Sequence, residues 1–255
     1  MERVMSDSAS EGGNRSVARS PVFDTTHWSV VLAAGNRDNP QAAEAMEKLC
    51  RTYWYPLYAF VRRKGYSVEE AEDLTQEFFG RLLRRDFPTG IQPEGGKFRS
   101  YLLAALKNLM ANEWQSRQTQ KRGGGQATFS LDELDAESRY QLEPADPSTP
   151  EALYERRWAS ILLEEVTRQL RSEYTAQGKA ELFDFLKAYL TGAEPRLPYA
   201  DLAQRLGMTE AAVKMAVHRL RKRFGQLLRR EIAQTVNGPE EVEGEIRHLI
   251  SATAR

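Results

Sequence analysis

Carboxylates are concentrated in the stretch EEAEDLTQE, residues 69–77. Glu69, Glu72, Asp73 and Glu77 could together hold Mg²⁺, because carboxylate oxygens are ligands that this ion prefers. The chain would then be a metal-dependent nuclease. However, a single helical stretch supplies all four side chains, and no His or Lys lies within it as a catalytic partner. An acidic face that is solvated or binds a protein is therefore the favoured interpretation.

Cations dominate a second stretch. Between Lys214 and Arg230 there are seven Lys and Arg residues and no acidic residue. Some of these cations could bind phosphates, and the side chains nearest the start of the stretch, Lys214, Met215 and His218, could reach base edges. The alternative is a helical hairpin with a solvated basic face.

A third stretch, KFRSYLLAALKNLMANEWQSRQTQKR (residues 97–122), combines Lys and Arg with aromatic residues. Phe98, Tyr101 and Trp114 could stack on unpaired bases while the cations meet phosphates, as in sites for single-stranded DNA. The alternative is that the aromatic side chains simply pack in a small helical core.

The elements that must position these residues have a helical pattern, with apolar residues three and four positions apart and no alternating strand. Helices are predicted near 26–34, 40–63, 67–85 and 97–118, with breaks at 35–40, 65 and 88–96. In the third of these, Ala71, Leu74, Phe78 and Leu82 form one apolar stripe. Asp73, Gln76 and Glu77 fall on another face, and an acidic patch suits a basic protein surface better than DNA.

The basic residues at 214–230 follow a turn. In YADLAQRLGMTEAAVKMAVHRLRKRF (residues 199–224), Gly207 supplies a turn that needs positive φ, and Thr209 can cap the next helix. The apolar residues that would pack the two helices together are Leu202, Ala203, Leu206, Val213, Val217 and Leu220. This pattern predicts a helix-turn-helix, whose second helix enters the major groove of DNA.

Composition indicates a soluble globular protein. The 255 residues carry 36 Lys and Arg against 36 Asp and Glu. The single cysteine, Cys50, excludes a disulfide framework and a cysteine-rich metal site, which fits the cytoplasm. No secretory signal and no apolar run long enough to span a bilayer is present, so no membrane association is expected.

The predicted fold is all-α, with two small helical domains joined by a flexible acidic linker. We expect a disordered leader at 1–22, a first domain at 23–122, the linker at 123–150, a second domain at 151–237 and an amphipathic helix at 238–255. The linker's acids could keep a solvated spacer extended, or could mimic nucleic acid; they are Asp132, Glu133, Asp135, Glu137, Glu143 and Asp146.

Two stretches carry a resemblance to a known family. LCRTYWYPLYAFVRRKGYSVEEAEDLTQEFFGRLL followed by GKFRSYLLAALKNLMANE resembles region 2 of bacterial sigma factors of the extracytoplasmic-function (ECF) type, within the sigma-70 family. LPYADLAQRLGMTEAAVKMAVHRLRKRF resembles their region 4, and the two motifs occur in the family's order across a linker. YWYPLYAFVRRKGY, DLTQEFF, KRGGG and HRLRKRF are similar to a subgroup with extended termini.

The resemblance implies roles for individual residues. It assigns contact with the clamp helices of core RNA polymerase to Asp73, Gln76 and Glu77. It assigns recognition and opening of the −10 promoter element to Lys97, Arg99, Tyr101, Asn108 and Asn112. It assigns the −35 element, and contact with the polymerase flap, to Lys214, Met215, His218, Arg219 and Lys222. It also implies that the linker passes through the polymerase's template and RNA channel.

Three positions depart from the family pattern: Tyr101 stands where Trp is usual, Asn112 where Asp is frequent, and Ala216 where a basic residue is frequent. These departures affect the promoter sequence that would be read. They do not affect the fold.

The resulting hypothesis is a non-enzymatic sigma factor that binds core polymerase and promoter DNA and has no cofactor of its own. An anti-sigma factor or another regulator is a further partner that the family suggests. A stand-alone helix-turn-helix transcriptional regulator is the alternative, and it leaves the acidic helix and the second basic helix without a role.

Overall fold

A computed structural model of the protein describes residues 40–84, 97–119, 133–143, 146–191 and 197–254. In this part of the chain there are helices and no strands, which confirms the all-α prediction. The leader predicted at 1–22 and the helix predicted near 26–34 lie outside the described residues. The helices are α2 (Pro40–Arg63), α3 (Val68–Arg84), α4 (Phe98–Thr119), α5 (Glu133–Leu142), α6 (Pro150–Ala176), α7 (Ala180–Leu186), α8 (Ala188–Thr191), α9 (Tyr199–Leu206), α10 (Glu210–Ala233) and α11 (Pro239–Thr253).

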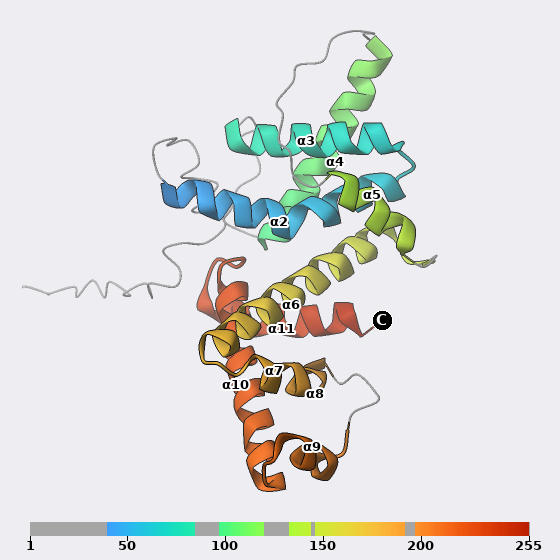
Figure 1. Ribbon diagram of the computed structural model, residues 1–255. Helices are drawn as coiled ribbons and strands as arrows, with labels where there is room; N and C mark the ends of the chain where they lie inside the picture. The colour runs from blue at the N-terminus through green and yellow to red at the C-terminus, as the bar shows by residue number, and fades with distance from the viewer. Residues whose placement is uncertain (1–39, 85–96, 120–132, 144–145, 192–196, 255) are drawn as a thin grey trace, which may run out of the picture.

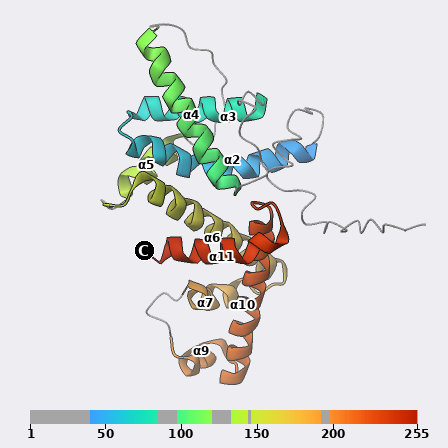
Figure 2. The ribbon, with the colours of Figure 1, turned by 180° about the vertical axis from the view of Figure 1, so that it is seen from behind.

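The helices form three groups along the molecule. Helices α2 to α5 lie at one end, α6 and α11 lie side by side in the middle, and α7, α8 and α9 lie with the first part of α10 at the other end (Figures 1 and 2). Helix α10 runs from the far end back to the middle, where it meets α6 and α11. The middle pair therefore connects the two ends.

Helix α2 is the centre of the first group. Every residue from 52 to 61 is buried, including Tyr53, Tyr58 and Phe60. A helix that is apolar on all sides must be covered on all sides, and α2 packs against α3, α4, α5 and α6. Cys50 in this helix is 7% exposed. Burial, followed by the charge of Glu47, raises the pKa of its thiol to about 12.

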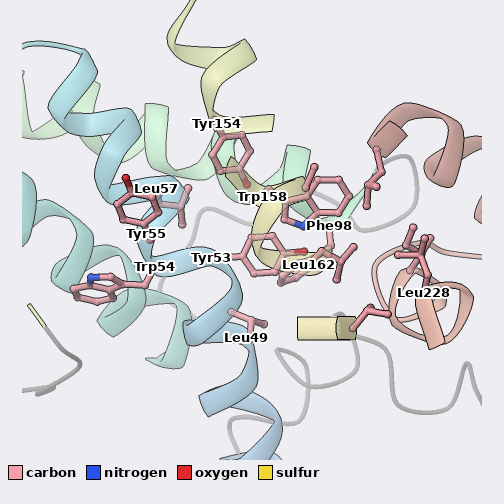
Figure 3. Close-up of a cluster of buried hydrophobic side chains, with 14 of the residues drawn as sticks. Leu49, Tyr53, Trp54, Tyr55, Leu57, Phe98, Tyr154, Trp158, Leu162 and Leu228 are labelled. Carbon is pink, nitrogen blue, oxygen red and sulfur yellow. The ribbon is translucent and has the colours of Figure 1, made fainter. Parts of the chain in front are cut away.

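The first and second predicted domains share one hydrophobic core. Trp158 of α6 is fully buried in a cluster with Tyr53 of α2 and Phe98 of α4 (Figure 3). The rings of Tyr53 and Phe98 meet edge to face with centroids 5.5 Å apart. This differs from the prediction of two tethered domains, because the aromatic residues of α6 complete the core that α2 and α4 begin.

The predicted flexible linker contains a helix. Residues 133–142 form α5, which docks on α2 through Glu137 and the half-buried Arg62. Arg62 donates to Glu137 from Nε at 2.9 Å and from Nη2 at 3.0 Å, and the Tyr58 hydroxyl donates to the same carboxylate at 2.5 Å. The linker prediction treated these acids as a solvated spacer or a mimic of nucleic acid, whereas three of the six, Glu137, Glu143 and Asp146, pair with arginines of the protein.

Local signals determine where α6 begins. Thr149 caps it by accepting a hydrogen bond from the Ala152 N–H at 3.2 Å, and Pro150 occupies its first turn. The helix ends before Gly178, which has a φ of 69° and is therefore in the left-handed region that glycine favours. No helix among the described residues is long and apolar enough to cross a bilayer.

Candidate nucleic-acid interface

Helix α3 presents the acidic face that the sequence predicted. Ser67 and Glu70 form a capping box at its start, with the Ser67 N–H donating to Glu70 at 3.0 Å and the Glu70 N–H donating to the Ser67 hydroxyl at 3.2 Å. The predicted apolar stripe is confirmed; Ala71, Leu74, Phe78 and Leu82 are all buried. The local pattern was sufficient because both the cap and the stripe are signals within one helix.

The predicted polymerase-binding residues lie on the outer side of α3. Asp73 is exposed, while Gln76 and Glu77 are half-buried. Arg81 donates to Glu77 at 2.7 Å, one turn along the same helix. The face is therefore acidic at Asp73 and partly neutralised one turn later.

The first turn of α4 is covered by other helices. Arg99 is only 3% exposed, and its Nε donates to Glu245 of α11 at 2.6 Å. Its Nη1 donates to Glu155 of α6 at 2.5 Å. Lys97 also pairs with Glu245, at 2.6 Å, so that two residues predicted to meet the −10 element are bound within the protein.

Glu245 is charged in this cluster, although it is fully buried. Burial acts to raise the pKa of its carboxyl, but hydrogen bonds and charge from Arg99 and Lys97 outweigh burial and leave the pKa lowered. Sequence reasoning missed Glu245 and Glu155. No local signal could have found them, since 146 and 56 residues separate them from Arg99.

The other predicted −10 residues lie further along α4. Tyr101 is half-buried beside Phe98, with ring centroids 6.1 Å apart, and burial raises the pKa of its hydroxyl. Asn108 and Asn112 are exposed. The side chain of Trp114 lies outside the described residues. The structure thus separates the predicted set into a covered start and an exposed later part.

Helices α9 and α10 are joined by a short turn. Gly207, with a φ of 60°, ends α9, and Thr209 caps α10 by accepting from the Ala212 N–H at 3.2 Å. The two helices pack through buried apolar residues; these are Leu202, Ala203, Val213, Val217 and Leu220. Cap, turn and packing follow the sequence prediction for this segment.

The predicted −35 residues are brought together on the exposed side of α10. Lys214, Met215, His218, Arg219 and Lys222 are all exposed, and Met215 has 56% of its surface in solvent. Lys214 pairs with Glu210 at 2.6 Å within the helix, which raises the pKa of its ammonium. An exposed methionine beside cations and a histidine could contact bases and phosphates together.

Other cations of the same basic stretch have structural partners. Arg221 donates to the carbonyl of Tyr189 at 3.0 Å, and Arg223 pairs with Glu173 of α6 at 2.6 Å. Arg229 pairs with Glu243 of α11 at 2.8 Å. The sequence could not show that these three cations have partners, because the partners come from other helices.

The carboxylates considered as a metal site do not form one. Among the described residues, no group of three or more His, Cys, Asp or Glu side chains is arranged to hold a metal ion. Glu69 and Asp73 are exposed on α3, and Glu77 pairs with Arg81.

Comparison with known proteins identifies one segment of the chain. No curated protein and no solved structure matches the chain significantly. The family model for sigma-70 region 2 matches residues 49–120, which contain most of α2 and all of α3 and α4. Proteins of the sigma-70 family are non-enzymatic transcription factors. Residues 49–120, which carry the acidic face of α3 and the partly covered α4, are therefore similar to sigma-70 region 2.

Proposed function

We propose that the protein is a sigma factor of the ECF type, which binds core RNA polymerase and directs promoter-specific transcription initiation. The observation that carries this proposal is the sigma-70 region 2 match over residues 49–120. Region 2 implies binding to core polymerase.

The acidic face of α3 supports polymerase binding. Asp73, Gln76 and Glu77 are the residues that we assign to the clamp helices of the polymerase. Asp73 is exposed on this face. A basic partner surface would be oriented by it, because charge complementarity sets orientation and the rate of association.

We assign recognition of the −10 element to one side of α4, from Lys97 and Arg99 through Tyr101 to Asn108 and Asn112. The two exposed asparagines offer donors and acceptors to unpaired bases. Lys97 and Arg99 would supply phosphate contacts once their present partners release them.

We assign recognition of the −35 element to α9 and α10 as the helix-turn-helix of region 4. Lys214, Met215 and His218 lie nearest the start of α10, where a recognition helix enters the major groove. Arg219 and Lys222 follow on the exposed side and suit phosphate contacts.

Transcription with purified core polymerase over a library of genomic fragments tests the function. We expect defined transcript starts that core polymerase alone does not give, and co-purification of the chain with the polymerase. Sequence-specific binding to duplex DNA without any affinity for core polymerase would instead identify a stand-alone helix-turn-helix regulator. The promoters recovered supply the DNA for the experiments below.

A further inference from the structure

The start of α4 is covered by two helices that lie outside the region 2 segment. In Figure 2 it lies beside the turn between α10 and α11. The Phe98 N–H donates to the carbonyl of Thr235 in that turn at 3.0 Å, and the Tyr154 hydroxyl of α6 donates to the carbonyl of Arg99 at 2.9 Å. The first backbone groups of α4 are thus hydrogen-bonded to α6 and to the turn before α11.

The ion cluster beneath this contact has a buried centre, formed by Arg99 and Glu245. Glu245 accepts from Arg99 through both oxygens, at 2.6 and 3.3 Å, and Glu155 accepts from the same guanidinium. Lys97 and Arg99 supply two positive charges against the two carboxylates, and His248 contacts Glu155 at 3.0 Å. The guanidinium also stacks over Trp158, 5.0 Å from the ring centroid. Both cations are thus paired with carboxylates of the protein.

A second ion pair joins the same parts of the molecule away from α4. Lys48 of α2 pairs with Glu231 of α10 at 2.5 Å, and Gln169 of α6 donates to the same carboxylate at 3.1 Å. Glu231 is 2% exposed. Buried pairs contribute little net stability while intact, yet removing one partner is costly because it leaves an uncompensated charge. Such a pair therefore favours the arrangement in which α2 and α10 are in contact over arrangements in which they are apart.

We propose that α11 is an autoinhibitory latch, in which Glu245 occupies the place of a DNA phosphate against Lys97 and Arg99 and keeps the start of α4 from promoter DNA. This inference rests on the proposed function. Binding of the −10 element would require α11 to leave α4. The exposed side of α10 is not covered in this state, since Lys214, His218 and Arg219 remain accessible. The latch therefore blocks −10 recognition and leaves −35 binding available.

Equilibrium arithmetic gives the expected effect. If only a fraction of the molecules is open, the apparent affinity for the −10 element falls by that fraction. Removing the charge of Glu245 leaves Arg99 enclosed with one carboxylate fewer, which raises the free energy of the closed state only. With an open state of about 10%, release would raise apparent −10 affinity by about tenfold.

Glu245→Gln in the full chain tests the latch, and Glu243→Gln is its matched control. Glu243 is on the same helix but pairs with Arg229 at an exposed site. At limiting protein, open-complex yield with core polymerase should rise about tenfold for Glu245→Gln and should stay at the wild-type value for Glu243→Gln. All three proteins should bind the isolated −35 duplex equally.

Equal yields from folded Glu245→Gln and wild type would overturn the latch alone, whereas absence of promoter-specific transcripts from wild type would overturn the proposed function and the latch together.

A second variant and a DNA-independent measurement cover the case in which Glu245→Gln does not fold. Lys48→Gln breaks the other ion pair without touching α4, and we expect it too to raise open-complex yield. Hydrogen exchange of residues 239–253 should be slow in the free wild-type chain and faster in the promoter complex, where α11 has left α4. Residues 180–186, at the other end of the molecule, should exchange equally in both. Equal protection of residues 239–253 in active promoter complexes and in the free chain, or wild-type yield from Lys48→Gln, would overturn the proposal.

Discussion

Neighbouring residues on the exposed side of α10 differ in what they can recognise. His218 can donate and accept hydrogen bonds at base edges, whereas the guanidinium of Arg219 is a fork of donors suited to phosphate. Both side chains are exposed, while Arg223 of the same helix is held by Glu173. The proposed roles can therefore be separated by single substitutions.

We expect Arg219→Ala to weaken binding to all −35 sequences about equally and to lower the slope of log affinity against log salt by about one. His218→Ala and Lys214→Ala should instead change the preferred sequence. Selection of binding sites at several salt concentrations measures both quantities. Arg223→Ala is the control and should leave the DNA slope unchanged; identical selected motifs for wild type, His218→Ala and Lys214→Ala would contradict the assignment.

Reversal of charge on α3 tests the polymerase-binding face. The double variant Asp73→Lys with Glu77→Lys should weaken binding to core polymerase, because loss of one partner of a desolvated charge pair costs about 2–5 kcal/mol. Titration of labelled protein with core polymerase measures this. Glu181→Lys, at an exposed position on α7, is the matched control. Wild-type affinity in the folded double variant would remove α3 from the interface.

At the scale of elements, α5 shows how charge can dock a short helix. Among its described apolar side chains, Ala136 is buried, Tyr140 is half-buried against the core and Leu142 is 84% exposed. Glu137 and Arg62 provide the specific contact with α2, and Arg139 stacks over Tyr55, 4.4 Å from the ring centroid. Docking should therefore depend on the charge of Glu137.

Acid should loosen α5. Hydrogen bonds from Arg62, chiefly, lower the pKa of Glu137 from its ordinary value of 4.5 to about 2. A lowered pKa means that the charged carboxylate stabilises docking above the ordinary value, and that this stabilisation is lost as pH falls from 4.5 toward 2. Hydrogen exchange of residues 133–142 over this range should show falling protection. Glu137→Gln should start less protected and vary less with pH; equal pH dependence in both proteins would show that another group controls docking.

The sequence predicted those elements whose signals are local. The stripe of Leu74 and Phe78 specified α3, and Thr209 with Gly207 specified the start of α10. It did not predict the partners of Arg99, because an ion pair between distant helices leaves no pattern in either one. The docking of residues 133–142 was missed for the same reason, since an acidic stretch has the same composition whether it meets solvent or arginines.

At the scale of the whole molecule, the shared core makes α2 and α6 depend on each other. Leu162 of α6 belongs to the cluster that contains Tyr53 and Phe98 (Figure 3). Leu202 of α9 is equally apolar and fully buried, but it packs against α10 at the other end. The same substitution at these two positions should therefore destabilise different parts of the molecule.

Leu162→Ala should lower the free energy of unfolding by about 2–5 kcal/mol through lost burial and a cavity. Hydrogen-exchange protection should then fall in α2 and α6 together. Leu202→Ala should reduce protection in α9 and the first half of α10 and leave α2 unchanged. Loss of protection confined to residues 150–254 in Leu162→Ala would indicate that the two ends fold independently.

Because Cys50 is buried, the reaction of its thiol would report the unfolding of α2. Only a thiolate attacks an aromatic disulfide reagent, and a thiol with a pKa of about 12 is almost wholly protonated at neutral pH. Because the sequence contains a single cysteine, coloured product would form once per molecule, and only after α2 has separated from its neighbours. The rate of that reaction at high reagent concentration would measure the lifetime of the packed state directly. It would require no label and no substitution.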